Sequence, residues 1–65
     1  MTNPSDRRHL LDVATAADYL TTSEHFVRRL IRERRIPYIK VGRHVRLDPD
    51  DLDIFIHQGR REARA

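Results

Sequence analysis

Two apolar stripes of helical spacing stand close together in the first half of the chain. The first follows Asp12, a good N-cap, and predicts a helix over residues 13–20 with a stripe formed by Val13, Ala16, Ala17 and Leu20. The second follows Ser23, another N-cap candidate, and predicts a helix over residues 24–34 with a stripe formed by Val27, Leu30 and Ile31. About three residues separate the two helices, which is the spacing of a helix-turn-helix motif.

The second of these helices is basic on the face opposite its apolar stripe. At about 100° per residue, that face carries His25, Arg29 and Arg32, with Arg28 beside them. One face is therefore expected to join the core, while the other is left for a partner. Pro37 is expected to stop the helix.

Residues 38–47 predict a β-hairpin that turns at Gly42. A two-residue loop would mix apolar and charged side chains on one face, whereas a three-residue loop formed by residues 42–44 gives a clean apolar face. The three-residue loop is therefore expected, with three cross-strand pairs: Val41 with Val45, Ile39 with Leu47, and Lys40 with Arg46. The last pair carries like charges and would be unfavourable unless an anion lay against it.

A third helix is predicted after the hairpin. Asp48 and Pro49 suit the N-cap and first helical position, and Asp50 and Asp51 suit the positive end of the helix dipole. Its buried stripe is expected to contain Leu52, Phe55 and Ile56, and the helix is expected to end at Gly59. The organisation predicted is a flexible leader (1–9), one folded domain (10–58) and a charged tail (59–65).

Several classes of protein are excluded by composition. A chain of 65 residues without cysteine builds at most one small domain and has neither disulfides nor a thiolate zinc site. It has no run of about 20 apolar residues that could span a bilayer. The four scattered histidines and the clustered aspartates lack metal-site spacing, and no catalytic constellation is present, so we expect no enzyme activity, metal or cofactor.

The charge distribution points to a polyanionic partner. The net charge is only +3, but residues 25–47 hold eight Lys and Arg against the single acid Glu33, a charge of +7. Nucleic acid is the commonest partner for such a field, because neutralised phosphates release condensed counterions. A solvated basic face is the alternative, and a basic module that binds an acidic protein or a membrane surface is a further one.

The order helix, turn, basic helix, hairpin and helix resembles the excisionase-like, MerR-type winged helix-turn-helix family over about residues 10–57. The resemblance rests on a small-residue helix that ends in Tyr-Leu, followed by the segments R-L-I-R-E, I-P and V-G-R. The sequence departs from the family at Thr21, where a turn glycine is usual and a left-handed residue would be strained, and at Phe26, where a small polar residue is more usual.

The resemblance implies a small α+β winged helix-turn-helix fold with two short helices, a β-hairpin wing and a C-terminal helix. It implies that the second helix enters the major groove of double-stranded DNA and that the wing reaches the adjacent minor groove or its phosphates. The recognition-helix contacts expected are Glu24, His25, Arg28, Arg29 and Arg32. The wing and phosphate contacts expected are Lys40, Arg43, His44 and Arg46.

The function expected from this resemblance is that of an excisionase, a recombination directionality factor that bends attachment-site DNA and directs an integrase toward excision. A small transcription regulator of the same fold is the alternative. A domain of this size reads few base pairs, so cooperative self-association on DNA is expected, and the tail from Gln58 is a candidate for contact with an integrase. The expected location is the bacterial cytoplasm, at the nucleoid, with no membrane association.

Overall fold

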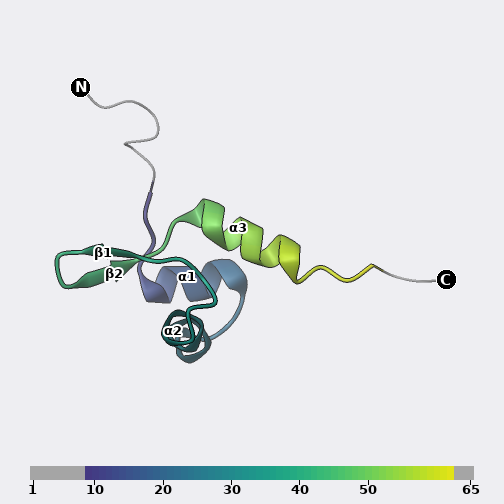
Figure 1. The fold of residues 1–65 in the computed structure, drawn as a ribbon, viewed down its shortest axis with the longest axis horizontal. Helices are drawn as coiled ribbons and strands as arrows, with labels where there is room; N and C mark the ends of the chain where they lie inside the picture. Colours follow the sequence, from purple (N-terminus) through teal and green to yellow (C-terminus); the bar gives the residue numbers. More distant parts are fainter. Residues whose placement is uncertain (1–8, 63–65) are drawn as a thin grey trace, which may run out of the picture.

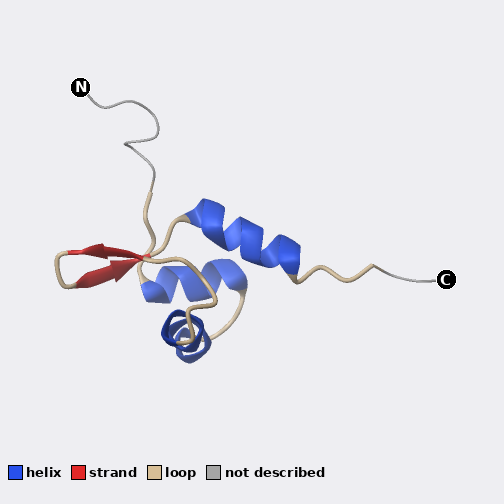
Figure 2. Cartoon of the chain, viewed as in Figure 1, coloured by secondary structure: helices blue, strands red, loops and turns tan. Residues whose placement is uncertain are grey.

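The computed structural model describes residues 9–62, and these form three helices and one two-stranded antiparallel hairpin (Figure 1). In chain order the elements are α1 (Val13–Leu20), α2 (Glu24–Arg32), β1 (Ile39–Val41), β2 (His44–Arg46) and α3 (Pro49–Gln58). The hairpin and α3 extend toward opposite ends of the molecule (Figure 2). This arrangement confirms the predicted α+β winged helix-turn-helix fold, with the hairpin as the wing. Parts of the predicted leader and tail, residues 1–8 and 63–65, lie outside the described residues.

The N-terminus of each helix is capped by the residue that the sequence predicts. Each cap has extended backbone, and its side-chain oxygen accepts a hydrogen bond from a backbone N–H that the helix itself cannot satisfy. The three bonds run from Thr15 N to Asp12 Oδ1 (2.8 Å), from Phe26 N to Ser23 Oγ (3.1 Å) and from Asp50 N to Asp48 Oδ1 (2.9 Å).

The turn between α1 and α2 is strained at Thr21, as the sequence predicts. Thr21 lies in the left-handed region at φ 57° and ψ 50°. The Thr22 N–H donates to the Ala17 carbonyl (2.8 Å) and the Thr21 N–H to the Asp18 carbonyl (3.0 Å), which is the Schellman pattern. A β-branched residue here costs roughly 1–2 kcal/mol relative to glycine, and the turn hydrogen bonds offset that cost.

The C-terminus of α2 repeats this motif and corrects the predicted boundary. The helix ends at Arg32, two residues before the expected end, because Arg34 turns left-handed at φ 57°. The Arg35 N–H donates to the Leu30 carbonyl (2.8 Å) and the Arg34 N–H to the Ile31 carbonyl (3.1 Å). The helix is thus closed by its own C-terminal turn before Pro37 is reached.

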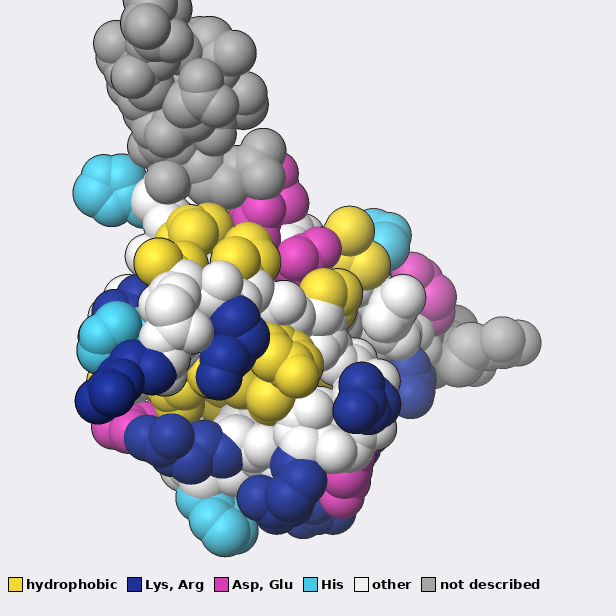
Figure 3. All heavy atoms as spheres, turned by 60° about the vertical axis from the view of Figure 1, so that its left-hand side comes forward, with side chains coloured by type: hydrophobic (Ala, Val, Ile, Leu, Met, Phe, Trp, Pro, Cys, Tyr) yellow, Lys and Arg dark blue, Asp and Glu magenta, His cyan; other side chains and the backbone are white. Residues whose placement is uncertain are grey.

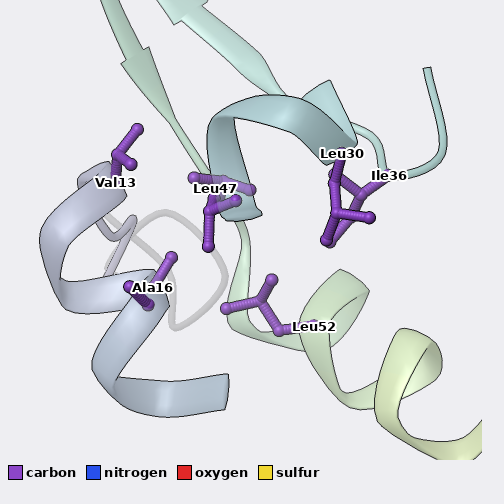
Figure 4. Close-up of a cluster of buried hydrophobic side chains, with 8 residues drawn as sticks. Val13, Ala16, Leu30, Ile36, Leu47 and Leu52 are labelled. Carbon is purple, nitrogen blue, oxygen red and sulfur yellow. The ribbon is translucent and has the colours of Figure 1, made fainter. Parts of the chain in front are cut away.

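One apolar core joins all three helices and the end of the hairpin (Figure 4). Its largest fully buried side chains are Val27 and Leu30 of α2, Leu47 after β2, and Leu52 of α3. Phe26, the departure from the family pattern, is partly buried and packs against this cluster.

The prediction for Ile56 is wrong. Its side chain is 49% exposed, although Leu52 is buried and Phe55 is partly buried as expected. The second half of α3 runs beyond the end of α1 (Figure 1), so the apolar stripe continues past the core that it would have joined.

The predicted hairpin register is also wrong. The strands pair Ile39 with Arg46, Lys40 with Val45 and Val41 with His44. Only Gly42 and Arg43 remain in the loop, and Gly42 has φ 65°. Glycine at the first position of a two-residue loop is typical of the type II′ turn, whose twist matches that of the strands.

The predicted register assumed that apolar side chains of the two strands pair on one buried face, and the hairpin has no such face. Ile39 and Val41 are 37% and 49% exposed, so no buried face of β1 selects the pairing. Leu47, the partner expected for Ile39, is instead bridged to Leu11 by two hydrogen bonds, from Leu11 N to Leu47 O (2.8 Å) and from Leu47 N to Leu11 O (2.7 Å). Lys40 consequently faces Val45, and the expected like-charge pair with Arg46 does not form.

No helix of residues 9–62 is long and apolar enough to cross a membrane.

Candidate nucleic-acid interface

The outward face of α2 is a row of exposed polar and cationic side chains. Val27 and Leu30 are fully buried, which fixes the rotation of the helix about its axis. His25, Arg28, Arg29 and Arg32 consequently lie exposed on the other side. The sequence-predicted contacts on this helix are therefore accessible to a partner.

Two of the α2 arginines are held in ion pairs within the helix. Arg28 Nη2 lies 3.1 Å from Glu24 Oε1, and Arg29 Nε lies 3.2 Å from Glu33 Oε2. All four side chains are about half exposed, so the attraction is screened and each pair contributes at most about 0.5 kcal/mol. Within the described part of the chain, Arg32 has no ion-pair partner. An external polyanion can therefore engage these guanidinium groups at little cost.

A groove brings the start of α2 together with the wing. It runs between the first turn of α1, the start of α2 and β2, and its charged and polar lining is formed by Asp12, Glu24, Arg28, Arg43, His44 and Arg46. Arg43 comes from the hairpin loop, and His44 and Arg46 come from β2. Five of the nine predicted contacts from the helix and the wing thus line one surface.

The other four predicted contacts lie outside this groove. His25, Arg29 and Arg32 are exposed on α2 but do not line it, and neither does Lys40 of β1. On the side of the molecule that bears the hairpin, Lys and Arg side chains spread over the surface around apolar patches, with acidic side chains nearer the edges (Figure 3). The cationic surface is therefore broader than the groove.

Arg46 is the least exposed cation of the wing. Its Nη1 donates a hydrogen bond to the carbonyl of the preceding residue, Val45 (2.8 Å), and the bond is partly buried. The positive charge of Arg46 also lowers the pKa of Asp12, which lines the same groove. The pKa of Asp12 lies below its usual value because the Thr15 N–H and then the Thr15 side chain donate hydrogen bonds to the carboxylate, and the Arg46 charge adds a smaller effect in the same direction.

Sequence reasoning missed two parts of this surface. Asp12 was recognised as a cap, but only the Leu11–Leu47 bridge brings it beside the wing. Arg34 and Arg35 belong to the basic segment but were not singled out. They line a second hollow with Pro37 and Tyr38, and the high charge of residues 25–47 was the signal that could have identified them.

The chemistry of the surface suits phosphate. Guanidinium groups match phosphate geometry with paired hydrogen-bond donors, and five of them lie in the groove or on the adjoining α2 face: Arg28, Arg29, Arg32, Arg43 and Arg46. Among residues 9–62, no group of three or more His, Asp or Glu side chains is placed to hold a metal ion.

Comparison with known proteins agrees with this geometry. A model of the helix-turn-helix domain matches residues 10–60, which include every element of the fold. No curated protein and no solved structure gives a significant match. The matched span covers most of the chain, and the chain belongs to the helix-turn-helix domain family as a DNA-binding protein of the winged form.

Proposed function

We propose that this protein is an excisionase, which binds and bends attachment-site DNA and directs an integrase toward excision. The proposal rests on the resemblance of residues 10–57 to excisionase-like domains, together with the helix-turn-helix domain match. In this proposal α2 enters the major groove, and the wing reaches the adjacent minor groove or the phosphates that border it.

The observation that carries the proposal is the groove between α2 and the wing. Arg28 projects from the helix into the same space as Arg43, His44 and Arg46 from the hairpin. A helix in one DNA groove and a wing in the next would place the phosphate backbone that divides the grooves beside these cations. Both elements can then contact one duplex at the same time.

Arg29 and Arg32 lie outside that groove, on the α2 face that would meet the base edges. An arginine can donate two hydrogen bonds to guanine O6 and N7. If Arg29 reads a base, Arg29→Ala should weaken binding to a specific site by about 1–3 kcal/mol. Equal losses on specific and random duplexes would show that Arg29 contacts phosphate only.

A single recognition helix with a wing reads few base pairs, so we propose that several copies bind cooperatively and that the charged tail contacts the integrase. Footprinting across a candidate attachment region and a candidate promoter tests this. An extended, phased footprint in the attachment region supports an excisionase. A single short footprint in the promoter supports the alternative, a transcription regulator.

A recombination assay with the cognate integrase tests the role directly. Excision should require the protein, and the double variant Arg28→Gln, Arg43→Gln should fail to support it. Arg60→Gln is the matched control for DNA binding, because Arg60 lies beyond α3 and pairs with Glu62 (3.5 Å), away from the groove. In the excision assay the same variant tests the proposed contact of the tail with the integrase. Excision that proceeds equally with and without the protein contradicts the proposal. Stronger binding to anionic liposomes than to DNA at equal ionic strength would favour a membrane partner.

A further inference from the structure

The C-terminal end of α2 carries more positive charge than its surroundings balance. Glu33 is shared between two cations, since Arg29 lies 3.2 Å from one of its carboxylate oxygens and Arg35 lies 3.7 Å from the other. Arg32 and Arg34 have no ion-pair partner among residues 9–62. The four arginines at this end of the helix carry a charge of +4 against the −1 of Glu33. The helix C-terminus supplies the equivalent of only about half a negative charge, so a surplus of about +2.5 remains.

Arg34 occupies a backbone position that glycine would fill without strain. It is the left-handed residue of the Schellman turn that closes α2, at φ 57°. A side chain there is strained relative to glycine, yet the residue is one of the largest and is exposed. Thr21 has the same left-handed backbone at the end of α1, so the positive charge is what distinguishes Arg34.

Arg34 lies at a second hollow of the surface. A shallow hollow is lined by Arg34, Arg35, Ile36, Pro37 and Tyr38, where the chain passes from α2 toward β1. Two arginines and a half-exposed tyrosine thus line one hollow, a composition that suits the sugar-phosphate backbone of DNA. This hollow shares no residue with the groove between α2 and the wing.

The length of α2 sets the separation between the groove beside the wing and the hollow at Arg34. Its nine residues span about 13 Å, close to the width of about 12 Å of the major groove. A helix seated there with its first turn beside the wing brings its last turn close to the opposite border of the groove.

We propose that Arg34, supported by Arg35, forms a second phosphate contact at the end of α2 farthest from the wing. The ligand is the DNA backbone on the other border of the major groove. This inference rests on the proposed binding of DNA through α2, and it adds a contact that the helix and wing do not provide.

The test compares Arg34→Gly with the wild-type chain on the footprinted duplex and on a random duplex over a range of salt concentrations. The variant should melt at a higher temperature, because glycine removes the left-handed strain. It should nevertheless bind DNA more weakly. The slope of log affinity against log salt should fall by about 0.9, the value for one phosphate contact, and by the same amount on both duplexes.

Two further variants separate the effect of the Arg34 charge on DNA binding from the effect of backbone strain on stability. Thr21→Gly releases the same left-handed strain at the end of α1 and should raise the melting temperature without changing the salt slope. Arg34→Lys keeps the charge at the strained position and should keep the wild-type slope.

An Arg34→Gly slope equal to that of the wild-type chain overturns the inference while leaving the proposed function intact. Loss of binding to polyglutamate with an unchanged slope on DNA also overturns it, and assigns Arg34 to an acidic protein partner. Failure of the wild-type chain to bind duplex DNA removes the proposed function itself, which is a distinct result.

Discussion

The hydroxyl of Tyr19 in α1 donates a hydrogen bond to the carboxylate of Asp53 in α3. The two residues are 34 positions apart in the chain, and the bond joins the helix-turn-helix to the C-terminal helix on a side that bears neither the groove nor the wing. It supplements the burial of Leu52, which is the one fully buried side chain of the described part of α3. The acidic first half of α3 is thereby held against α1.

Tyr19→Phe should lower the melting temperature and leave DNA affinity unchanged, because it removes the bond between the helices and nothing in the proposed interface. The hydrogen bond to Asp53 holds the pKa of Tyr19 above its usual value of about 10. A raised pKa in the folded state means that this stabilisation is present below pH 10 and is lost as the pH rises through the folded-state pKa. Denaturant unfolding of both proteins from pH 7 to pH 11 should therefore show their stabilities converging.

Asp12→Asn should change the response to acid. The Thr15 N–H and side chain hold the pKa of Asp12 below its usual value, so its stabilising effect is present above about pH 4 and is lost as the pH falls. Asparagine keeps the cap but cannot titrate. Between pH 6 and pH 3, the wild-type chain should lose more unfolding free energy than the variant. Equal losses would show that the carboxylate charge does not contribute.

Arg43→Ala should weaken DNA binding most where the sequence flanking the site is rich in A·T pairs. Arg43 lies in the two-residue loop at the tip of the wing, and a cation there suits a narrow minor groove, where the negative potential is strongest. Titrations with A·T-rich and G·C-rich flanks measure the effect. If wild-type and variant proteins are both insensitive to the flank, the wing does not enter the minor groove.

Leu47→Ala should destabilise the domain by about 2–5 kcal/mol, because Leu47 is fully buried at the junction of all three helices and the hairpin. Ile56→Ala is the matched control. Its side chain is half exposed beyond the core, so its loss should change the unfolding free energy by about 0.5 kcal/mol or less. Thermal or denaturant unfolding distinguishes the two variants. Similar losses would show that the end of α3 is packed in solution.

Features that depend on neighbours three or four residues away could be predicted from the sequence. The N-caps at Asp12, Ser23 and Asp48 were confirmed, and so were the bounds of α1 and the strained turn at Thr21. Caps, apolar periodicity and turn hydrogen bonds all act over about one helical turn, so adjacent residues determine them. The same local reasoning placed the cationic face of α2 opposite its buried stripe.

Features that depend on which distant segments meet could not be predicted from neighbouring residues. Because β1 is exposed, the Gly42-Arg43 turn determines the hairpin register. Ile56 is exposed because the core ends before it along α3. The Leu11–Leu47 bridge carried the wing and Asp12 to the start of α2, which made a groove from residues that are far apart in the sequence. The helices, their caps and the basic face of α2 could be predicted from neighbouring residues, because they follow from local hydrogen bonds and spacing. Burial and long-range pairing decided how those parts form one surface.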